Sequence, residues 1–179
     1  TRSLIFSLLA SVAPLTAGAQ QVLVFPDGSV QSYVTAETSS NFKLPIGPFA
    51  GGKIDATLVV GAVVRQVWKT PNSQSETFDL IQPLRSQLKN DGFEVLFECE
   101  TQACGGFDFR FNADVVDEPD MHVDLGDFRY LSASKRVGGN EEFVGVLVSR
   151  SPDRGYIQVT TVGSEELIEP KVALSTKQP

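Results

Sequence analysis

The sequence predicts an α+β domain in which one main helix packs on an antiparallel sheet of about six strands. Two observations lead to this prediction. A segment with helical spacing of apolar residues, 74–91, is followed by a series of alternating or β-branched segments. The last of these are separated by short turns suited to hairpins, at 137–140 and 151–155. A helix followed by consecutive strands favours an antiparallel sheet with the helix on one face.

The amino-terminal part carries weaker signals. Residues 21–25 and 29–35 are consistent with two short strands around a Pro26-Asp27-Gly28-Ser29 turn. The following residues, 35–52, include two prolines and three glycines, so we expect an irregular arm over 20–55. The α+β domain itself is then expected over 56–163, and its first strand over 57–69, where β-branched residues are frequent.

A helix is predicted over 74–91. Ser73 and Glu76 have the spacing of a capping box, and Gly92 stands where a left-handed cap would end the helix. Pro83 lacks a backbone donor and is expected to kink or shorten it. The apolar stripe expected to face the sheet consists of Phe78, Ile81, Leu84 and Leu88.

Five further strands are expected after the helix. Apolar residues alternate with charged ones over 93–99 and again over 107–111, and their aromatic side chains are expected to fill the core beneath the helix. The remaining three strands are predicted over 128–136, 142–150 and 156–162.

The amino terminus predicts export. Residues 1–19 contain a basic residue, a short apolar stretch and a final Ala17-Gly18-Ala19, the order of a secretory signal peptide. The apolar stretch is too short to span a bilayer, so no transmembrane span is expected in the mature segment. The formal net charge is −7, without a cluster of Lys and Arg, which argues against nucleic acid and anionic lipid as partners.

Two cysteines, Cys99 and Cys104, lie five residues apart. In an oxidising compartment such a pair is most simply a disulfide. A zinc site would need four ligands, and His122 is the sole histidine; a thioredoxin-like centre would need C-x-x-C spacing. We therefore predict a disulfide that pins a tight turn between two strands and stabilises the fold by roughly 2 kcal/mol.

The acidic segment 114–127 is the candidate binding site. Asp120, His122 and Asp124 stand two residues apart, so on an extended chain they would share one face and begin a divalent-cation site. The alternative is a solvated acidic connection. No G-x-S-x-G elbow, phosphate loop or dinucleotide fingerprint occurs, so neither an enzyme nor a bound cofactor is expected. Tyr130, on a predicted strand, is expected to pack in the core or across strands.

Four stretches carry a resemblance to a known family: LPIGPFAGG at 44–52, LIQPLRSQLKNDGFEVLFECETQACGGFDFRF at 80–111, PDMHVDLGDFRYLSA at 119–133 and VLVSRS at 146–151. By these, residues 44–163 resemble the amino-terminal region of exported OmpA-family proteins of Gram-negative bacteria. In that family this region typically precedes an OmpA-like domain that binds peptidoglycan.

The resemblance implies a non-enzymatic module of the cell envelope, in the periplasm or at the outer membrane, with envelope proteins or peptidoglycan as partners. The peptidoglycan contact would belong to a following domain, and residues 164–179 are expected to be a polar linker or tail before it. The alternative function is a periplasmic domain that binds a divalent cation through the acidic segment 114–127.

Overall fold

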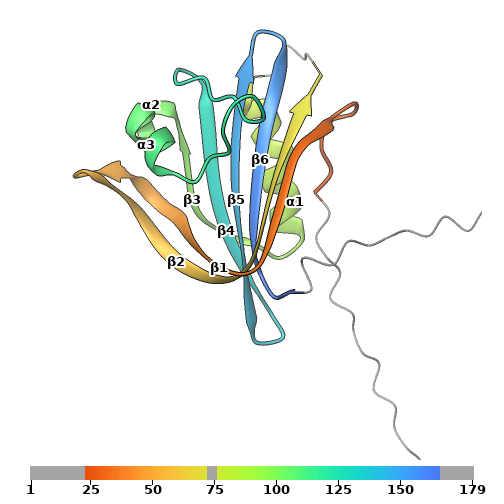
Figure 1. The fold of residues 1–179 in the computed structure, drawn as a ribbon, viewed down its shortest axis with the longest axis vertical. Helices are drawn as coiled ribbons and strands as arrows, with labels where there is room; N and C mark the ends of the chain where they lie inside the picture. Colours follow the sequence, from red (N-terminus) through yellow and green to blue (C-terminus); the bar gives the residue numbers. More distant parts are fainter. Residues whose placement is uncertain (1–22, 72–75, 166–179) are drawn as a thin grey trace, which may run out of the picture.

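The computed structural model describes residues 23–71 and 76–165. It consists of one six-stranded antiparallel sheet with a few short helices, which confirms the predicted fold class (Figure 1). The strands are β1 (Val30–Ala50), β2 (Lys53–Thr70), β3 (Glu94–Glu100), β4 (Phe128–Val137), β5 (Asn140–Ser151) and β6 (Arg154–Gly163). The helices are α1 (Thr77–Asn90), α2 (Thr101–Cys104) and α3 (Gly106–Asn112). The strand order in the sheet is β1-β2-β6-β5-β4-β3.

Helix α1 covers one face of the sheet. Its buried side chains pack on alternate residues of β4, β5 and β6, which form the largest apolar cluster. Leu80, Ile81, Leu84 and Leu88 are all buried, and burying each contributes about 2 kcal/mol. Phe78, predicted to belong to this stripe, is instead exposed, and Leu80 takes its place. The helix continues through Pro83.

The ends of α1 are fixed by local hydrogen bonds. The backbone N–H of Glu76, the residue before the helix, donates to the Asp79 carboxylate (3.3 Å). Glu76 and Asp79 thus form the capping box, in which Glu76 is the first member instead of the predicted second. The predicted partner Ser73 lies outside the described residues. At the other end Gly92 has φ +87°, and Phe93 N–H donates to the Leu88 carbonyl (2.9 Å), which caps the helix as predicted.

The expected irregular arm over 20–55 is wrong from residue 30 onward. β1 is a strand of 21 residues that pairs with β2 from Val30 opposite Lys69 to Ala50 opposite Lys53. The register shifts between Pro45 and Phe49, where prolines interrupt the ladder, and this shift allows the strand to continue. The sheet therefore begins at residue 30 instead of 56. The predicted signal peptide, 1–19, and the tail after residue 165 lie outside the described residues.

The expected strand over 107–111 is also wrong, because these residues form helix α3. Alternate residues share a face in a strand, but in a helix they lie about 200° apart, whereas residues four apart lie close together. Phe109 is therefore buried, while Phe107 and Phe111 lie side by side on the exposed face of α3.

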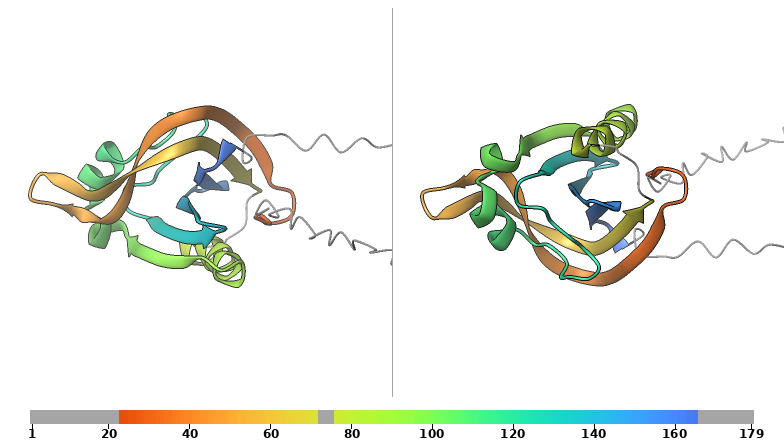
Figure 2. Two further views of the ribbon diagram at one scale, coloured as in Figure 1. Left: turned by 90° about the horizontal axis from the view of Figure 1, so that it is seen from below. Right: turned by 90° about the horizontal axis from the view of Figure 1, so that it is seen from above.

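The sheet is strongly curved, and the β1–β2 hairpin arches over its second face toward α2 and α3 (Figure 2). The Ser132 hydroxyl on β4 donates to the Pro45 carbonyl on β1 (2.7 Å) across this concave face. Residues 113–127 also cross it. The Gln158 side chain of β6 holds them by accepting from Val116 N–H (2.8 Å) and donating to the Asp114 carbonyl (2.8 Å).

Within residues 23–71 and 76–165, no helix combines the length and the apolar character that crossing a membrane requires.

Candidate functional site

The two cysteines are joined at one corner of the molecule. Cys99 of β3 and Cys104 of α2 form a disulfide, with an S–S distance of 2.00 Å and a Cα–Cα distance of 5.1 Å. The predicted pairing is present. The bridge does not pin a turn between two strands, however, because the chain after Cys104 is helical. It ties the end of β3 to the one-turn helix α2 and so fixes where α3 begins.

Gly105 joins α2 to α3 in a conformation that side chains rarely adopt, with φ +114°. A Cβ atom at this position would lie 2.6 Å from the Cβ of Phe49, near the end of β1. The part of β1 at Phe49 therefore packs directly on this corner, and the absence of a side chain at Gly105 makes the approach possible.

Thr101, the first residue of α2, is the non-glycine residue with positive φ among the described residues (φ +35°). Its hydroxyl donates to the Phe128 carbonyl (3.3 Å) and accepts from the Phe128 N–H (3.4 Å). These two bonds extend the β3–β4 pairing past the end of the strand, and they account for the unusual backbone conformation.

Helix α3 presents an exposed aromatic pair at the disulfide-linked corner. Phe107 and Phe111 are 58% and 61% exposed, and their ring centroids lie 4.4 Å apart. The Arg110 guanidinium lies 5.2 Å from the centroid of the Phe111 ring. We call the side chains of Phe107, Arg110 and Phe111 the aromatic corner. Its support is rigid, since Phe109 on the opposite side of α3 is fully buried against Phe128 and Tyr130.

The predicted cation ligands Asp120, His122 and Asp124 have separate partners. Asp120 faces Lys69, with Oδ1 and Nζ 4.0 Å apart, and His122 Nδ1 lies 2.6 Å from Glu118 Oε1. Asp124 accepts from the backbone N–H of Gly126 (2.8 Å). Across the described ranges there is no group of three or more His, Cys, Asp or Glu side chains placed to hold a metal ion.

The reason lies in the backbone of the acidic segment. Met121 N–H donates to the Asp117 carbonyl (3.3 Å), so the chain turns here instead of running extended. The alternation of Asp120, His122 and Asp124 consequently does not place them on one face. Met121, between the first two, is fully buried in the concave core.

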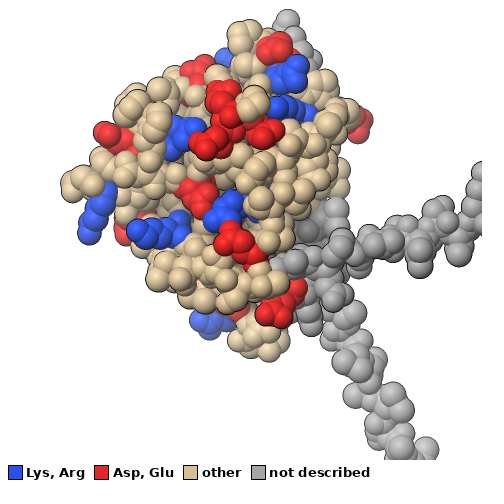
Figure 3. All heavy atoms as spheres, viewed as in Figure 1, with Lys and Arg blue, Asp and Glu red and all other residues tan. Residues whose placement is uncertain are grey.

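The negative charge of this segment is balanced by basic residues from the sheet. Arg65 of β2 contacts the Asp114 carboxylate through both Nε (3.1 Å) and Nη2 (2.7 Å), and its Nη1 lies 2.6 Å from Glu37 of β1. Arg150 of β5 pairs with Asp127 through its Nε alone. Figure 3 shows acidic and basic side chains interspersed over this face of the molecule.

The contacts of this cluster shift the pKa of Arg65 and of Glu37. The hydrogen bonds that Arg65 donates to Asp114 raise the pKa of its guanidinium, and the contact with Glu37 adds a smaller contribution. Bonds from Ser40 and then from Arg65 lower the pKa of the Glu37 carboxyl. No sequence pattern indicates this cluster, because Glu37 and Asp114 lie 28 and 49 residues from Arg65 and only the folding of the acidic segment over β2 brings them together.

No protein-family model and no curated protein matches the chain. The relation to the amino-terminal region of OmpA-family proteins therefore stays a prediction that depends on the sequence motifs.

Proposed function

We propose that this chain is a non-enzymatic module of the bacterial cell envelope, exported to the periplasm or the outer membrane, where it contacts another envelope protein. The observation that carries the proposal is the aromatic corner on a disulfide-linked support. The OmpA-like motifs and the signal-peptide pattern of residues 1–19 support the location.

The disulfide supports an oxidising compartment, since cysteines are kept reduced in the cytosol. It also supports a binding role for the corner. A rigid support lowers the conformational entropy lost on binding, and the bridge, the buried Phe109 and the close contact of Gly105 with Phe49 all restrict α3.

The aromatic corner fits a protein surface better than it fits the sugars of peptidoglycan. Protein interfaces are enriched in aromatic residues and arginine, and the corner combines two phenylalanines with Arg110. Two phenylalanines offer no hydroxyl or amide to a sugar, and one face of Phe111 is already covered by Arg110. Attachment to peptidoglycan is accordingly assigned to a following domain of the OmpA type.

The proposal is tested by crosslinking in intact Gram-negative cells that express the chain with its amino-terminal residues. A photo-crosslinking amino acid replaces Asp108, which lies between the two phenylalanines on α3. We expect a discrete product with one envelope protein, which disappears when Phe107→Ser and Phe111→Ser are combined. Leu58→Ser with Val60→Ser is the matched control, because these β2 side chains are 61% and 68% exposed but lie away from the corner.

Three results would contradict the proposal. One is the absence of any product, and another is a product that persists in the Phe107→Ser/Phe111→Ser variant. The third is binding to purified peptidoglycan that this same variant abolishes, which would make the cell wall the occupant of the corner. Fractionation with thiol alkylation tests the location separately: we expect the chain outside the cytoplasm with Cys99 and Cys104 protected from alkylation.

A further inference from the structure

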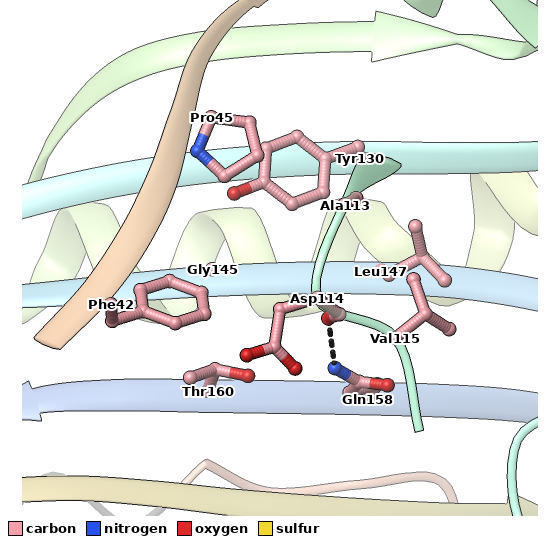
Figure 4. A pocket seen from close by; sticks show the side chains of 10 residues that line it. All are labelled: Phe42, Pro45, Ala113, Asp114, Val115, Tyr130, Gly145, Leu147, Gln158 and Thr160. Atoms are coloured by element: carbon pink, nitrogen blue, oxygen red, sulfur yellow. Dashed lines mark hydrogen bonds between the residues drawn. The ribbon is translucent and has the colours of Figure 1, made fainter. Parts of the chain in front are cut away.

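A small cavity lies on the concave face, lined by β1, the start of the acidic segment and the strands β4, β5 and β6 (Figure 4). Its volume is about 10 Å³. Apolar side chains such as Phe42 and Leu147 form much of its wall, and the polar residues in the wall are Tyr130, Asp114, Gln158 and Thr160.

The Tyr130 hydroxyl reaches this cavity without a protein partner. The residue is 5% exposed, and its hydroxyl is the buried side-chain polar atom that lacks a hydrogen bond within the described residues. Gly145 provides the space beside it, because a Cβ atom at Gly145 would lie 3.0 Å from the Tyr130 oxygen. The Ser132 hydroxyl, two residues along β4, donates instead to the Pro45 carbonyl.

We propose that this cavity is a binding site for one ordered water molecule, which pairs with the Tyr130 hydroxyl and with a second polar group of the wall. A volume of about 10 Å³ corresponds to about one water-sized probe, and a buried water needs at least two polar partners. The Thr160 hydroxyl supplies the second partner. The Gln158 amide is already bonded to the backbone of Val116 and Asp114, and the Asp114 carboxylate is already bonded to Arg65.

The roof of the cavity limits the ligand to this size. Phe42 is 4% exposed and the neighbouring Leu44 is fully buried, and the Ser132–Pro45 hydrogen bond holds the same part of β1. A larger ligand would have to displace this part of β1 and expose both side chains to solvent. The site is therefore part of how β1 is held on the sheet, and it is independent of the contact made by the aromatic corner.

The effect of Tyr130→Phe on stability tests the proposal through its sign. In a dry cavity the substitution removes an unpaired buried hydroxyl and raises the urea midpoint. In a cavity that holds water it removes one of the water's partners and lowers the midpoint. We expect a lower midpoint, with Tyr156→Phe as the control, because Tyr156 is only partly buried and has no role in the cavity.

A crystal structure of the unmodified chain at high resolution provides the second measurement. We expect density for a water within hydrogen-bond distance of the Tyr130 oxygen, and its loss or displacement in the Tyr130→Phe protein. A cavity without such density, or a Tyr130→Phe protein with a higher urea midpoint than the unmodified chain, would overturn the proposal.

Discussion

Replacing Gly105 by alanine should be among the more destabilising single changes at the disulfide-linked corner. The left-handed backbone alone costs a residue with a side chain about 1–2 kcal/mol. The new methyl group would also lie 2.6 Å from the Phe49 Cβ, where ordinary carbon contacts are about 3.5–4.0 Å. Overpacking of this kind typically costs about 1–3 kcal/mol. We therefore expect Gly105→Ala to lower the free energy of unfolding by about 2–5 kcal/mol.

Gly92→Ala is the matched control for this substitution. Gly92 has φ +87°, but no atom lies within 4 Å of the position that a Cβ would take. Gly92→Ala should therefore lower the free energy of unfolding only by the cost of the left-handed backbone, about 1–2 kcal/mol. Urea unfolding of the two variants and the unmodified chain measures both losses, and their difference isolates the contact with Phe49. Losses that agree within about 0.5 kcal/mol would refute the close contact between Phe49 and Gly105.

Truncating Phe49 should not rescue the alanine variant. The Cβ built at Gly105 also meets the Phe49 carbonyl oxygen at 3.0 Å and its Cα at 3.2 Å, and these atoms remain in Phe49→Ala. The two substitutions should therefore be nearly additive. A double variant that recovers the stability of Phe49→Ala alone would show that the phenyl ring, not the backbone, causes the conflict.

Three further outcomes are expected. Replacing Cys99 and Cys104 by serine should cost about 2 kcal/mol in urea unfolding, and a reduced chain with the midpoint of the oxidised one would contradict this. Arg65→Lys should cost about 1–2 kcal/mol, because lysine cannot contact Asp114 through two nitrogens; full stability in the lysine variant would refute the role of that geometry. Burial raises the pKa of the Tyr130 hydroxyl above its ordinary value of 10.0, so the folded state favours the neutral hydroxyl. The stability that this shift contributes is fully present below pH 10 and is lost as the pH rises above it. Stability should fall above pH 10 by up to about 1.4 kcal/mol per pH unit, and a Tyr130→Phe protein with the same pH dependence would contradict this.

The strands from β3 onward, apart from the segment 107–111, follow from the sequence because their information is local. Alternation over 93–99 and the turns at 137–140 and 151–155 specify which residues pair and which face each side chain takes. Helix α1 is equally local, since its apolar spacing and the glycine at position 92 lie within the segment itself. These patterns predicted the fold class, the main helix and five of the six strands; the sixth predicted strand, 107–111, is helix α3, and β1 completes the sheet instead.

The structure of β1 depends on its partner. Its residues 35–50 include Pro45 and Pro48 and a polar stretch, and their local pattern resembles a loop. These residues form a strand because they pair with β2, which is rich in β-branched residues and supplies the partners for their backbone hydrogen bonds. The local sequence of β1 does not indicate this pairing.

At the aromatic corner, too, the local sequence pattern and the tertiary contacts decide different features. The alternation of Phe107, Phe109 and Phe111 has the period of a strand. It is also compatible with a helix in which Phe107 and Phe111 share the exposed face and Phe109 is buried on the other. The sequence by itself determined the cysteine pair and most of the sheet. Only the tertiary structure decided that α3 is a helix, that its aromatic pair faces outward, and that Asp114, Asp120 and Asp127 meet basic side chains instead of one another. The physical reason is that these outcomes depend on contacts between residues far apart in the chain, which no local pattern encodes.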